Sequence, residues 1–295
     1  MATPASAQAT RPPVHDIAPP APSAPRPEVP DPGHGILHLS ATLTSELPLA
    51  RAGINWRIYA DSTEADGSHK LVTQTDEALP TLSLPDGRYI VHATFGFSST
   101  MKRVDIADRV TSERLALNAG ALSIVGLLGD IPVPPEKLSL SIFVPEHGNP
   151  ESKLVVADAK PGRIIRLPEG SYHVVSTYLD TVGVGSLTPV SHTNSVVSAD
   201  LKVQAGKLVQ ATVRHRAATL TLKLVKAPGG EALANSSFTI LTPGGDVIRE
   251  LIGAYPSLVL AEGDYVAIGR HDGKTFQSEF KVQSALDRDV EVIAK

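Results

Sequence analysis

Residues 84–91 read LPDGRYIV, and this phrase decides the fold because it returns as LPEGSYHV at 167–174 and as LAEGDYVA at 260–267. The glycines of successive phrases are 83 and 93 residues apart. A feature that recurs at such a long period indicates tandem domains rather than a solenoid of short repeats. We therefore expect three related domains in series.

Each phrase predicts a tight turn that leads into a strand. Proline suits the second position of such a turn and an acidic residue the third, and we expect the glycine to adopt a positive φ. The tyrosine two residues later has the placement of the tyrosine corner in Greek-key sandwiches, where the ring packs inward and the hydroxyl bonds to nearby backbone. This structural turn or corner role is assigned to Gly87, Tyr89, Gly170, Tyr172, Gly263 and Tyr265.

Outward from each phrase, the chain reads as short alternating segments separated by turn residues. About seven such strands per repeat, with no long helical period, are typical of β-sandwiches. The expected fold class is all-β, with three tandem Greek-key sandwich domains, immunoglobulin-like or transthyretin-like, behind a disordered proline-rich arm. Trp56 shares a face with Ile54 and Ile58, so we place it in the core of the first domain.

The domain boundaries follow from aligning the first strand of each repeat. We expect the arm at 1–34 and the three sandwiches at 35–118, 119–217 and 218–295. Because the joints between the domains are only a few residues long, the sequence predicts a fairly stiff rod.

The middle domain is longer than its neighbours between the turn glycine and the late strand. In the first domain 17 residues separate Gly87 from Val104. In the middle domain 31 residues separate Gly170 from Leu201, so we expect an insertion at about 182–195.

This insertion is the candidate partner-binding loop, since long loops on rigid scaffolds are enriched in function. It begins with flexible, apolar residues and ends with several hydrogen-bonding side chains. The candidate binding residues are Gly183, Gly185, His192, Thr193 and Asn194. An equally good alternative is an extra hairpin that only extends the sheet, with a strand at 187–190.

The N-terminal arm bears the one localisation signal. A segment so rich in proline, with so little apolar bulk, cannot form a core, and we interpret it as a passive tether rather than a docking strip. Ala7 and Ala9 fit the small-x-small pattern of a signal-peptidase site, which predicts a signal-peptide remnant at 1–9, although no charged or apolar stretch precedes it. The expected location is periplasmic or extracellular, or cytoplasmic if no signal peptide lies upstream.

Composition bounds the function. The chain has 295 residues, 42% of them apolar and 20% charged, with a net charge of −4 and no strong charge block. This balance gives no electrostatic footprint for nucleic acid or an anionic membrane. No run approaches the roughly 18 apolar residues that span a bilayer. Zero cysteines exclude disulfides, thiolate metal sites and cysteine catalysis.

Motifs for catalysis are incomplete. The GKT at 273–275 suggests a phosphate-binding loop, but Ile268 stands where that loop needs a glycine. The GVGSL at 183–187 lacks the Gly-x-Ser-x-Gly order of a serine hydrolase. We therefore expect no catalytic residue, no cofactor and no enzyme activity.

Ten histidines raise the question of a metal site. His34 and His38 lie four residues apart, but in a strand such neighbours diverge by about 13 Å at about 3.3 Å per residue. His215 lies in the basic segment RHR at 214–216, and His271 lies in an expected hairpin. We interpret all of these as solvated surface histidines and expect no metal.

The phrase L-P-D/E-G-x-Y-x-V resembles the bacterial carboxypeptidase regulatory-like, transthyretin-like sandwich modules and, more distantly, the Cna B-type repeats of surface proteins. The resemblance implies a sandwich fold and a use as stalk, spacer or binding unit. Cna B-type modules often carry an acid four residues after the tyrosine that assists an isopeptide crosslink. Ala93, Ser176 and Gly269 occupy those positions here, so no such bond is expected.

The expected function is a non-catalytic, exported structural or binding rod of tandem sandwiches. The alternative is an accessory protein that recruits or positions an enzyme or an envelope polymer through a loop of the middle domain. In either case the partner is an unknown protein or envelope component.

Overall fold

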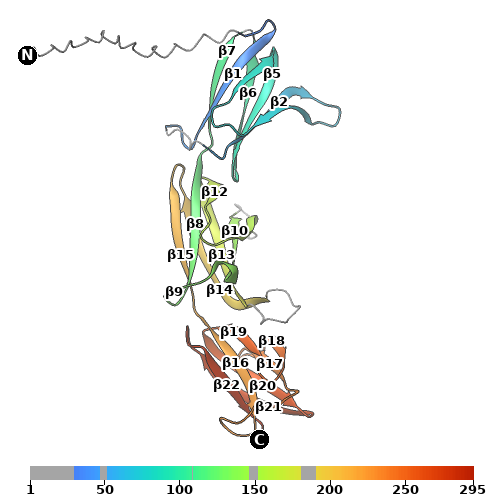
Figure 1. The fold of residues 1–295 in the computed structure, drawn as a ribbon, viewed down its shortest axis with the longest axis vertical. Coiled ribbons are helices and arrows are strands. Elements are labelled where there is room, and N and C mark those ends of the chain that lie inside the picture. Colours follow the sequence, from blue (N-terminus) through green and yellow to red (C-terminus); the bar gives the residue numbers. More distant parts are fainter. Residues whose placement is uncertain (1–29, 47–51, 108, 146–151, 181–190) are drawn as a thin grey trace, which may run out of the picture.

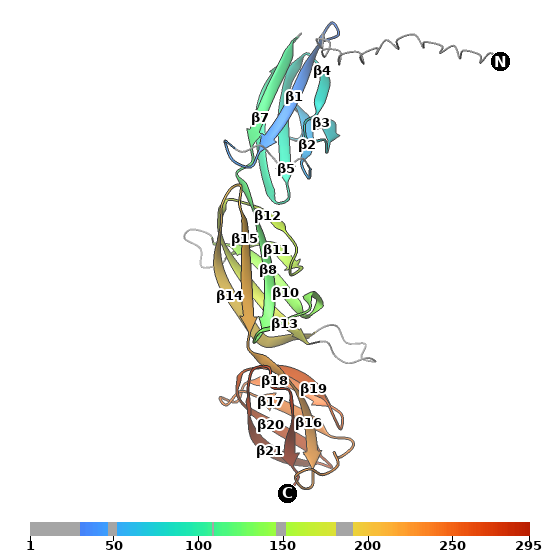
Figure 2. The same ribbon diagram turned by 60° about the vertical axis from the view of Figure 1, so that its left-hand side comes forward.

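The computed structural model describes residues 30–46, 52–107, 109–145, 152–180 and 191–295. Nearly all regular structure in these ranges is β-strand, arranged as three β-sandwiches that follow one another along the long axis of the molecule (Figure 1 and Figure 2). The expectation of an all-β chain with three tandem sandwiches is confirmed.

The first sandwich packs a three-stranded sheet against a four-stranded sheet. The smaller sheet has the order β4-β1-β7, with β1 antiparallel to β4 and parallel to β7. The larger sheet is antiparallel and has the order β3-β2-β5-β6. The strands are β1 (His34–Thr42), β2 (Asn55–Thr63), β3 (His69–Thr75), β4 (Thr81–Pro85), β5 (Gly87–Phe95), β6 (Ser98–Ile106) and β7 (Val110–Ala116).

The second sandwich repeats this topology with the orders β12-β8-β15 and β11-β10-β13-β14. A short β9 (Ile131–Pro132) pairs with β8, and a 3-10 helix, η1 (Pro135–Lys137), precedes β10. The other strands are β8 (Ala119–Leu128), β10 (Leu138–Val144), β11 (Lys153–Ala159), β12 (Ile165–Pro168), β13 (Gly170–Asp180), β14 (Ser191–Val203) and β15 (Leu208–His215).

The third sandwich has the same plan, with the orders β19-β16-β22 and β18-β17-β20-β21. Its strands are β16 (Ala217–Val225), β17 (Ser237–Leu241), β18 (Val247–Ile252), β19 (Ser257–Ala261), β20 (Gly263–His271), β21 (Lys274–Val282) and β22 (Arg288–Ile293). The repeat in sequence is therefore a repeat of strand order.

Alternating apolar residues build a core between the two sheets of each sandwich. In the first, Ile54, Trp56 and Ile58 are fully buried on one face of the β2 segment, as predicted. The indole N–H of Trp56 donates to the carbonyl of Glu77, which satisfies the one polar group that the ring buries. The single tryptophan thus reports on the core of the first sandwich alone.

The recurring phrase carries the chain from the smaller sheet to the larger one. In the first sandwich β4 ends at Pro85 and β5 begins at Gly87. Each phrase tyrosine is buried and donates its hydroxyl to the carbonyl four residues upstream, at 2.8, 2.8 and 2.9 Å for the pairs Tyr89–Pro85, Tyr172–Pro168 and Tyr265–Ala261. This bond fixes the crossing between the sheets.

The expected positive φ is wrong for Gly87 and Gly170, neither of which lies in the left-handed region. The ring of the following tyrosine lies over each glycine, and a Cβ added at either position would meet a ring carbon at 3.7 Å. Both glycines therefore face the corner tyrosine in an ordinary backbone conformation.

The joints between sandwiches are short. β7 ends at Ala116 and β8 begins at Ala119, while β15 ends at His215 and β16 begins at Ala217. Within the described part of the chain, no helix has the length and apolar character needed to cross a bilayer.

Candidate functional site

The polar residues at the C-terminal end of the predicted insertion lie at the joint between the second and third sandwiches. The β13–β14 hairpin has strands of 11 and 13 residues, whereas the matching strands of the other sandwiches have nine. Both of its strands contact β19 of the third sandwich. The hairpin extension therefore reaches the next sandwich.

The predicted insertion divides into two parts. Residues 182–190, including the candidate residues Gly183 and Gly185, lie outside the described residues. Residues 191–195 belong to β14, where His192 pairs through its backbone with Leu179 of β13. This end of the insertion extends the sheet, whereas the strand that the hairpin alternative places at 187–190 lies outside the described residues.

Asn194 connects the hairpin to the tyrosine corner of the third sandwich. Its side-chain carbonyl accepts the backbone N–H of Ala261 at 2.8 Å, and its amide nitrogen donates to the Tyr265 hydroxyl at 2.9 Å. That hydroxyl in turn donates to the Ala261 carbonyl at 2.9 Å. Both ends of the Asn194 amide are engaged within the chain.

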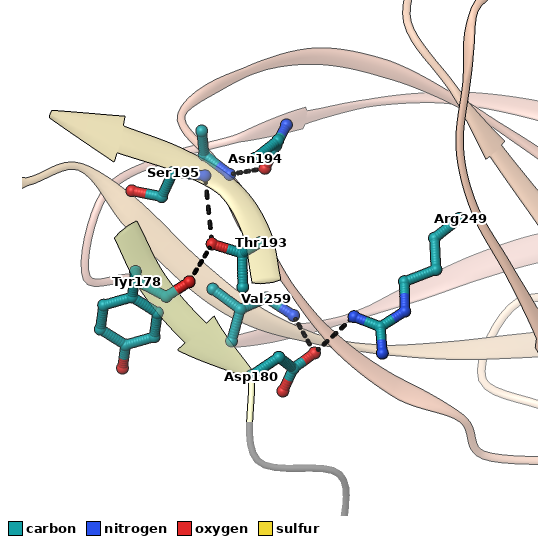
Figure 3. A network of polar contacts seen from close by, with 8 residues as sticks. Tyr178, Asp180, Thr193, Asn194, Ser195, Arg249 and Val259 are labelled. Atoms are coloured by element: carbon teal, nitrogen blue, oxygen red, sulfur yellow. Dashed lines mark hydrogen bonds and ion pairs between the residues drawn. The ribbon is translucent and has the colours of Figure 1, made fainter. Parts of the chain in front are cut away.

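Asp180, the last residue of β13, makes a second polar contact across the joint. Its side chain is largely buried and points toward Arg249 of β18 (Figure 3). One carboxylate oxygen accepts the backbone N–H of Val259 at 3.0 Å and lies 3.3 Å from the Arg249 guanidinium. Hydrogen bonds of this kind let a carboxylate remain buried, because they replace the water it loses.

Thr193 holds the two strands of the hairpin together where their register shifts, between Thr177 and Leu179. Its hydroxyl donates to the carbonyl of Tyr178 at 2.8 Å and accepts the backbone N–H of Ser195 at 3.1 Å (Figure 3). A bulge leaves backbone groups without ladder partners. The threonine hydroxyl supplies one and so stabilises the extended end of the hairpin.

Apolar contacts and a surface ion pair complete this joint. A small buried cluster spans it and contains Val133, Leu138, Tyr178, Ala217 and Val259. On the surface, the guanidinium of Arg216 makes two contacts with the carboxylate of Glu262, at 2.9 and 3.0 Å. An exposed ion pair of this type adds at most about 1 kcal/mol.

The interpretation of His215 as a solvated surface residue is wrong. The residue is fully buried, with Nε2 at 2.8 Å from the Ser176 hydroxyl and Nδ1 at 3.0 Å from the Ser195 hydroxyl. The Tyr178 ring packs beside it, with 5.8 Å between ring centroids. Strand alternation carried the missed signal, because His215 shares the inward face of β15 with buried Val213.

The surroundings of His215 set its charge. Desolvation lowers its pKa below the ordinary 6.5, partly offset by a hydrogen bond with the Ser195 backbone, so the imidazole is neutral near pH 7. A serine beside a histidine is also the start of a hydrolytic triad. Here the second partner of the ring is another serine, and all three side chains are buried. The arrangement joins the two sheets rather than presenting a nucleophile.

The first joint is built from different residues. The guanidinium of Arg166 lies 4.5 Å from the Phe95 ring centroid, and the Arg166 carbonyl accepts the backbone N–H of Phe97 at 3.0 Å. Gly96 lies in the turn between β5 and β6 with φ +64, and its backbone approaches Arg166 so closely that a Cβ at this position would clash with it. Nothing in the sequence pattern had marked these residues.

Other sequence candidates take structural positions. Asp272 and Gly273 form the two-residue turn between β20 and β21 with φ of 49 and 75, so the GKT segment is part of a hairpin, as expected.

A depression of about 500 Å³ beside the second joint is lined in part by Arg216, Glu262 and Lys281. Among the described residues, no group of three or more histidines and carboxylates could hold a metal ion.

Several solved structures resemble the chain at low identity. The TIE protein of Bacillus anthracis is 18% identical with a TM-score of 0.26, over 89% of this chain and 50% of that one. A streptococcal ancillary pilin is 13% identical with a TM-score of 0.31, over 89% and 99% of the two chains. The major pilin subunit of Bacillus cereus is 12% identical with a TM-score of 0.23, over 89% and 100%.

The chain spans half the length of the first of these proteins, and at such TM-scores the likeness carries no argument about function. A search of curated proteins found no match. Residues 219–294, which lie in the third sandwich, match the Rhizobiales growth-associated tandem repeat domain, so this part of the chain is similar to that repeat.

Proposed function

We propose that the chain is a non-catalytic structural or binding rod. It holds its sandwiches in a fixed line and displays them at a distance that the N-terminal arm sets. The observation that supports this most directly is the joint between the second and third sandwiches. Asn194 and Asp180 reach from one sandwich to backbone groups of the next. A short linker would set the distance between the sandwiches but not their orientation.

Bending at this joint would break both apolar and polar contacts. Opening the joint would expose the apolar cluster around Tyr178 and would separate Asp180 from the Val259 N–H and from Arg249. Water would replace the lost partners in the opened joint, so each of these polar contacts contributes about 0.5–1.5 kcal/mol net. Several such contacts in one joint favour a single orientation over a freely jointed chain.

Distance measurements across the joint test the rod. The chain has no cysteine, so cysteines introduced at exposed Lys153 on β11 and Lys274 on β21 can be spin-labelled specifically. We expect a narrow distance distribution that broadens in the Asp180→Ala/Asn194→Ala variant. A label pair at Lys70 and Lys153, which spans the first joint, serves as the matched control and should not change. A broad distribution in the unmodified joint would contradict the rod.

The second candidate function is an accessory module that recruits or positions an enzyme or an envelope polymer. It is motivated by the insertion, which belongs to the middle sandwich and ends beside the third. Thr193 and Asn194 already bond within the chain, so a partner would have to use the rest of the insertion. Replacing 182–190 by a short Gly-Ser turn, with 191–195 kept, should abolish capture of a co-purifying partner, and full retention by the folded variant would exclude this site.

The proposed location is periplasmic or extracellular, which the signal-peptidase pattern at Ala7 and Ala9 supports. N-terminal sequencing of the mature protein tests this, because cleavage after Ala9 would leave Thr10 as the first residue. Recovery of the uncleaved chain in the cytoplasmic fraction would contradict export.

A further inference from the structure

A buried polar triad lies at the end of the second sandwich that faces the third. Ser176 belongs to β13 and Ser195 to β14, both in the larger sheet, whereas His215 is the last residue of β15 in the smaller sheet. The two ring nitrogens contact the two serine hydroxyls at 2.8 and 3.0 Å. The triad therefore ties the two sheets together.

The triad is specific to the middle sandwich. Six residues after the turn glycine, where Ser176 lies, the other sandwiches have Ala93 and Gly269. Directly after β7, at the place that His215 takes in the second sandwich, the first sandwich has the buried Leu117. An apolar core serves its neighbours at this place, so the buried histidine is an added feature rather than a requirement of the fold.

The strands that hold the triad also supply the residues that contact the third sandwich. Asn194 immediately precedes Ser195, and Asp180 ends the strand of Ser176. Two residues follow His215 directly. Arg216 pairs with Glu262 of the third sandwich, and Ala217 packs in the buried cluster that spans the joint. Any movement of β14 or β15 that lets water reach the ring would displace the residues that contact the third sandwich.

The charges that face the ring are few. On β13 the inward titratable groups are Tyr172, which bonds to Pro168 at the corner, Tyr178, and Asp180, which is already paired with Arg249. From the third sandwich, the charge of Asp287 helps to raise the pKa of Tyr178, and the Asp287 carboxylate accepts the backbone N–H of Thr219.

Among the described residues of β14 and β8, no carboxylate faces the ring. The inward residues of β14 and β8 nearest the joint are Thr193, Ser195, Gly126 and Leu128. The flanking arginines pair elsewhere, Arg214 with Asp130 and Arg216 with Glu262. Since both ring nitrogens contact hydroxyls, an imidazolium here would be buried with no counter-charge beside it in the part of the chain that the structure describes.

We propose that the triad of His215, Ser176 and Ser195 is a pH-sensitive latch, which holds the joint when the imidazole is neutral and loosens it when the imidazole is protonated. The direction follows from proton linkage. Burial lowers the pKa of His215 below 6.5, and an opening of the joint that lets water reach the ring returns its pKa toward the ordinary value. The opened form therefore binds protons more tightly, so the latch is closed above about pH 6.5 and weakens as the pH falls below it.

The latch is tested with the spin labels at Lys153 and Lys274, compared at about pH 7.5 and about pH 5, because only histidine titrates in that range without a perturbed pKa. We expect one narrow distance at the higher pH and its loss at the lower pH. The variant Ser176→Ala/His215→Leu/Ser195→Ala removes the three side chains together, so none of these side chains is left without its side-chain partner. It should keep the narrow distance at both pH values.

Control measurements separate the possible failures. The inference rests on the proposed rod. A broad distance distribution at both pH values in the wild-type sequence would contradict the rod itself. A narrow distance at both would leave the rod intact and overturn the latch. Broadening of the triple variant at low pH would assign the response to another group, which also overturns the latch. Labels at Lys70 and Lys153 should show no pH response. The variant His173→Gln should behave as the wild type, because His173 is half-buried on the outer face of β13 and pairs with Asp200 rather than with the triad.

Discussion

The amide of Asn194 and the hydroxyl of Tyr265 lie 2.9 Å apart across the joint between the second and third sandwiches. The same hydroxyl closes the tyrosine corner of the third sandwich by donating to Ala261. One corner tyrosine out of three is thus also a contact between domains. The internal structure of the third sandwich and its attachment to the second share a bond.

This sharing predicts a ranking among three conservative substitutions. Tyr89→Phe and Tyr172→Phe remove one hydrogen bond each and should lower the free energy of unfolding by about 0.5–1.5 kcal/mol. Tyr265→Phe also removes the acceptor of the Asn194 amide, so its cost should be larger by about 1 kcal/mol. Urea denaturation followed by circular dichroism measures all three. Equal costs would show that the Asn194 contact contributes nothing to stability.

A second ranking concerns Asp180. Asp180→Ala removes the acceptor of the Val259 N–H and the partner of Arg249 together, so we expect a loss of about 2–3 kcal/mol. Arg249→Ala leaves the bond to Val259 in place, so the carboxylate keeps one partner and the loss should be smaller, about 1–2 kcal/mol. The double variant should cost little more than Asp180→Ala alone, because the two changes remove the same ion pair. Additive losses in thermal unfolding would contradict a direct interaction.

The pH dependence of stability follows from His215. Its folded pKa is lowered from 6.5 by burial, so the folded protein binds fewer protons than the unfolded chain. Stability is then complete above about pH 6.5 and is lost progressively as the pH falls toward the folded pKa. The unfolding temperature of the second sandwich should fall over this window, and the Ser176→Ala/His215→Leu/Ser195→Ala variant should flatten the dependence. An unchanged slope in that variant would remove His215 from the explanation.

The sequence was sufficient to predict most of the fold, because alternation and turn chemistry are local signals. The three turn phrases and the buried face of Trp56 follow from residues close together in the chain. The φ of Gly87 could not be predicted in the same way. A turn between two sheets is set by how the sheets pack, and the corner tyrosine rather than a left-handed backbone explains that glycine.

The site was less predictable, since its bonds join residues far apart in the chain. Asn194 and Tyr265 are separated by 71 residues, and Asp180 and Val259 by 79. Which side chain meets the next sandwich depends on the length of the β13–β14 hairpin and on the orientation of the joint. The length difference was visible as an insertion, but the direction of the hairpin was not. The boundaries predicted for the three domains stay a prediction.

The last prediction concerns the first joint and uses two glycines as a matched pair. Gly96 and Gly67 both have positive φ, +64 and +83, so alanine at either position meets the same kind of backbone strain. At Gly67 a Cβ would find nothing within 4 Å, whereas at Gly96 it would lie 2.6 Å from the Cβ of Arg166 and 2.9 Å from its carbonyl oxygen. The strain alone costs about 1 kcal/mol.

Gly67→Ala should therefore lower stability by about that amount and leave the distance between labels at Lys70 and Lys153 unchanged. Gly96→Ala has to push Arg166 away, which breaks the backbone bond to Phe97 and the contact with the Phe95 ring, so it should broaden that distance as well as destabilise the first sandwich. Fluorescence of Trp56 follows the unfolding of the first sandwich in both variants, because that core holds the only tryptophan of the chain. If the two variants give the same distance distribution, Gly96 and Arg166 do not hold the first joint, and its orientation is set by other contacts, such as the bond from the Ala119 N–H to the Leu43 carbonyl.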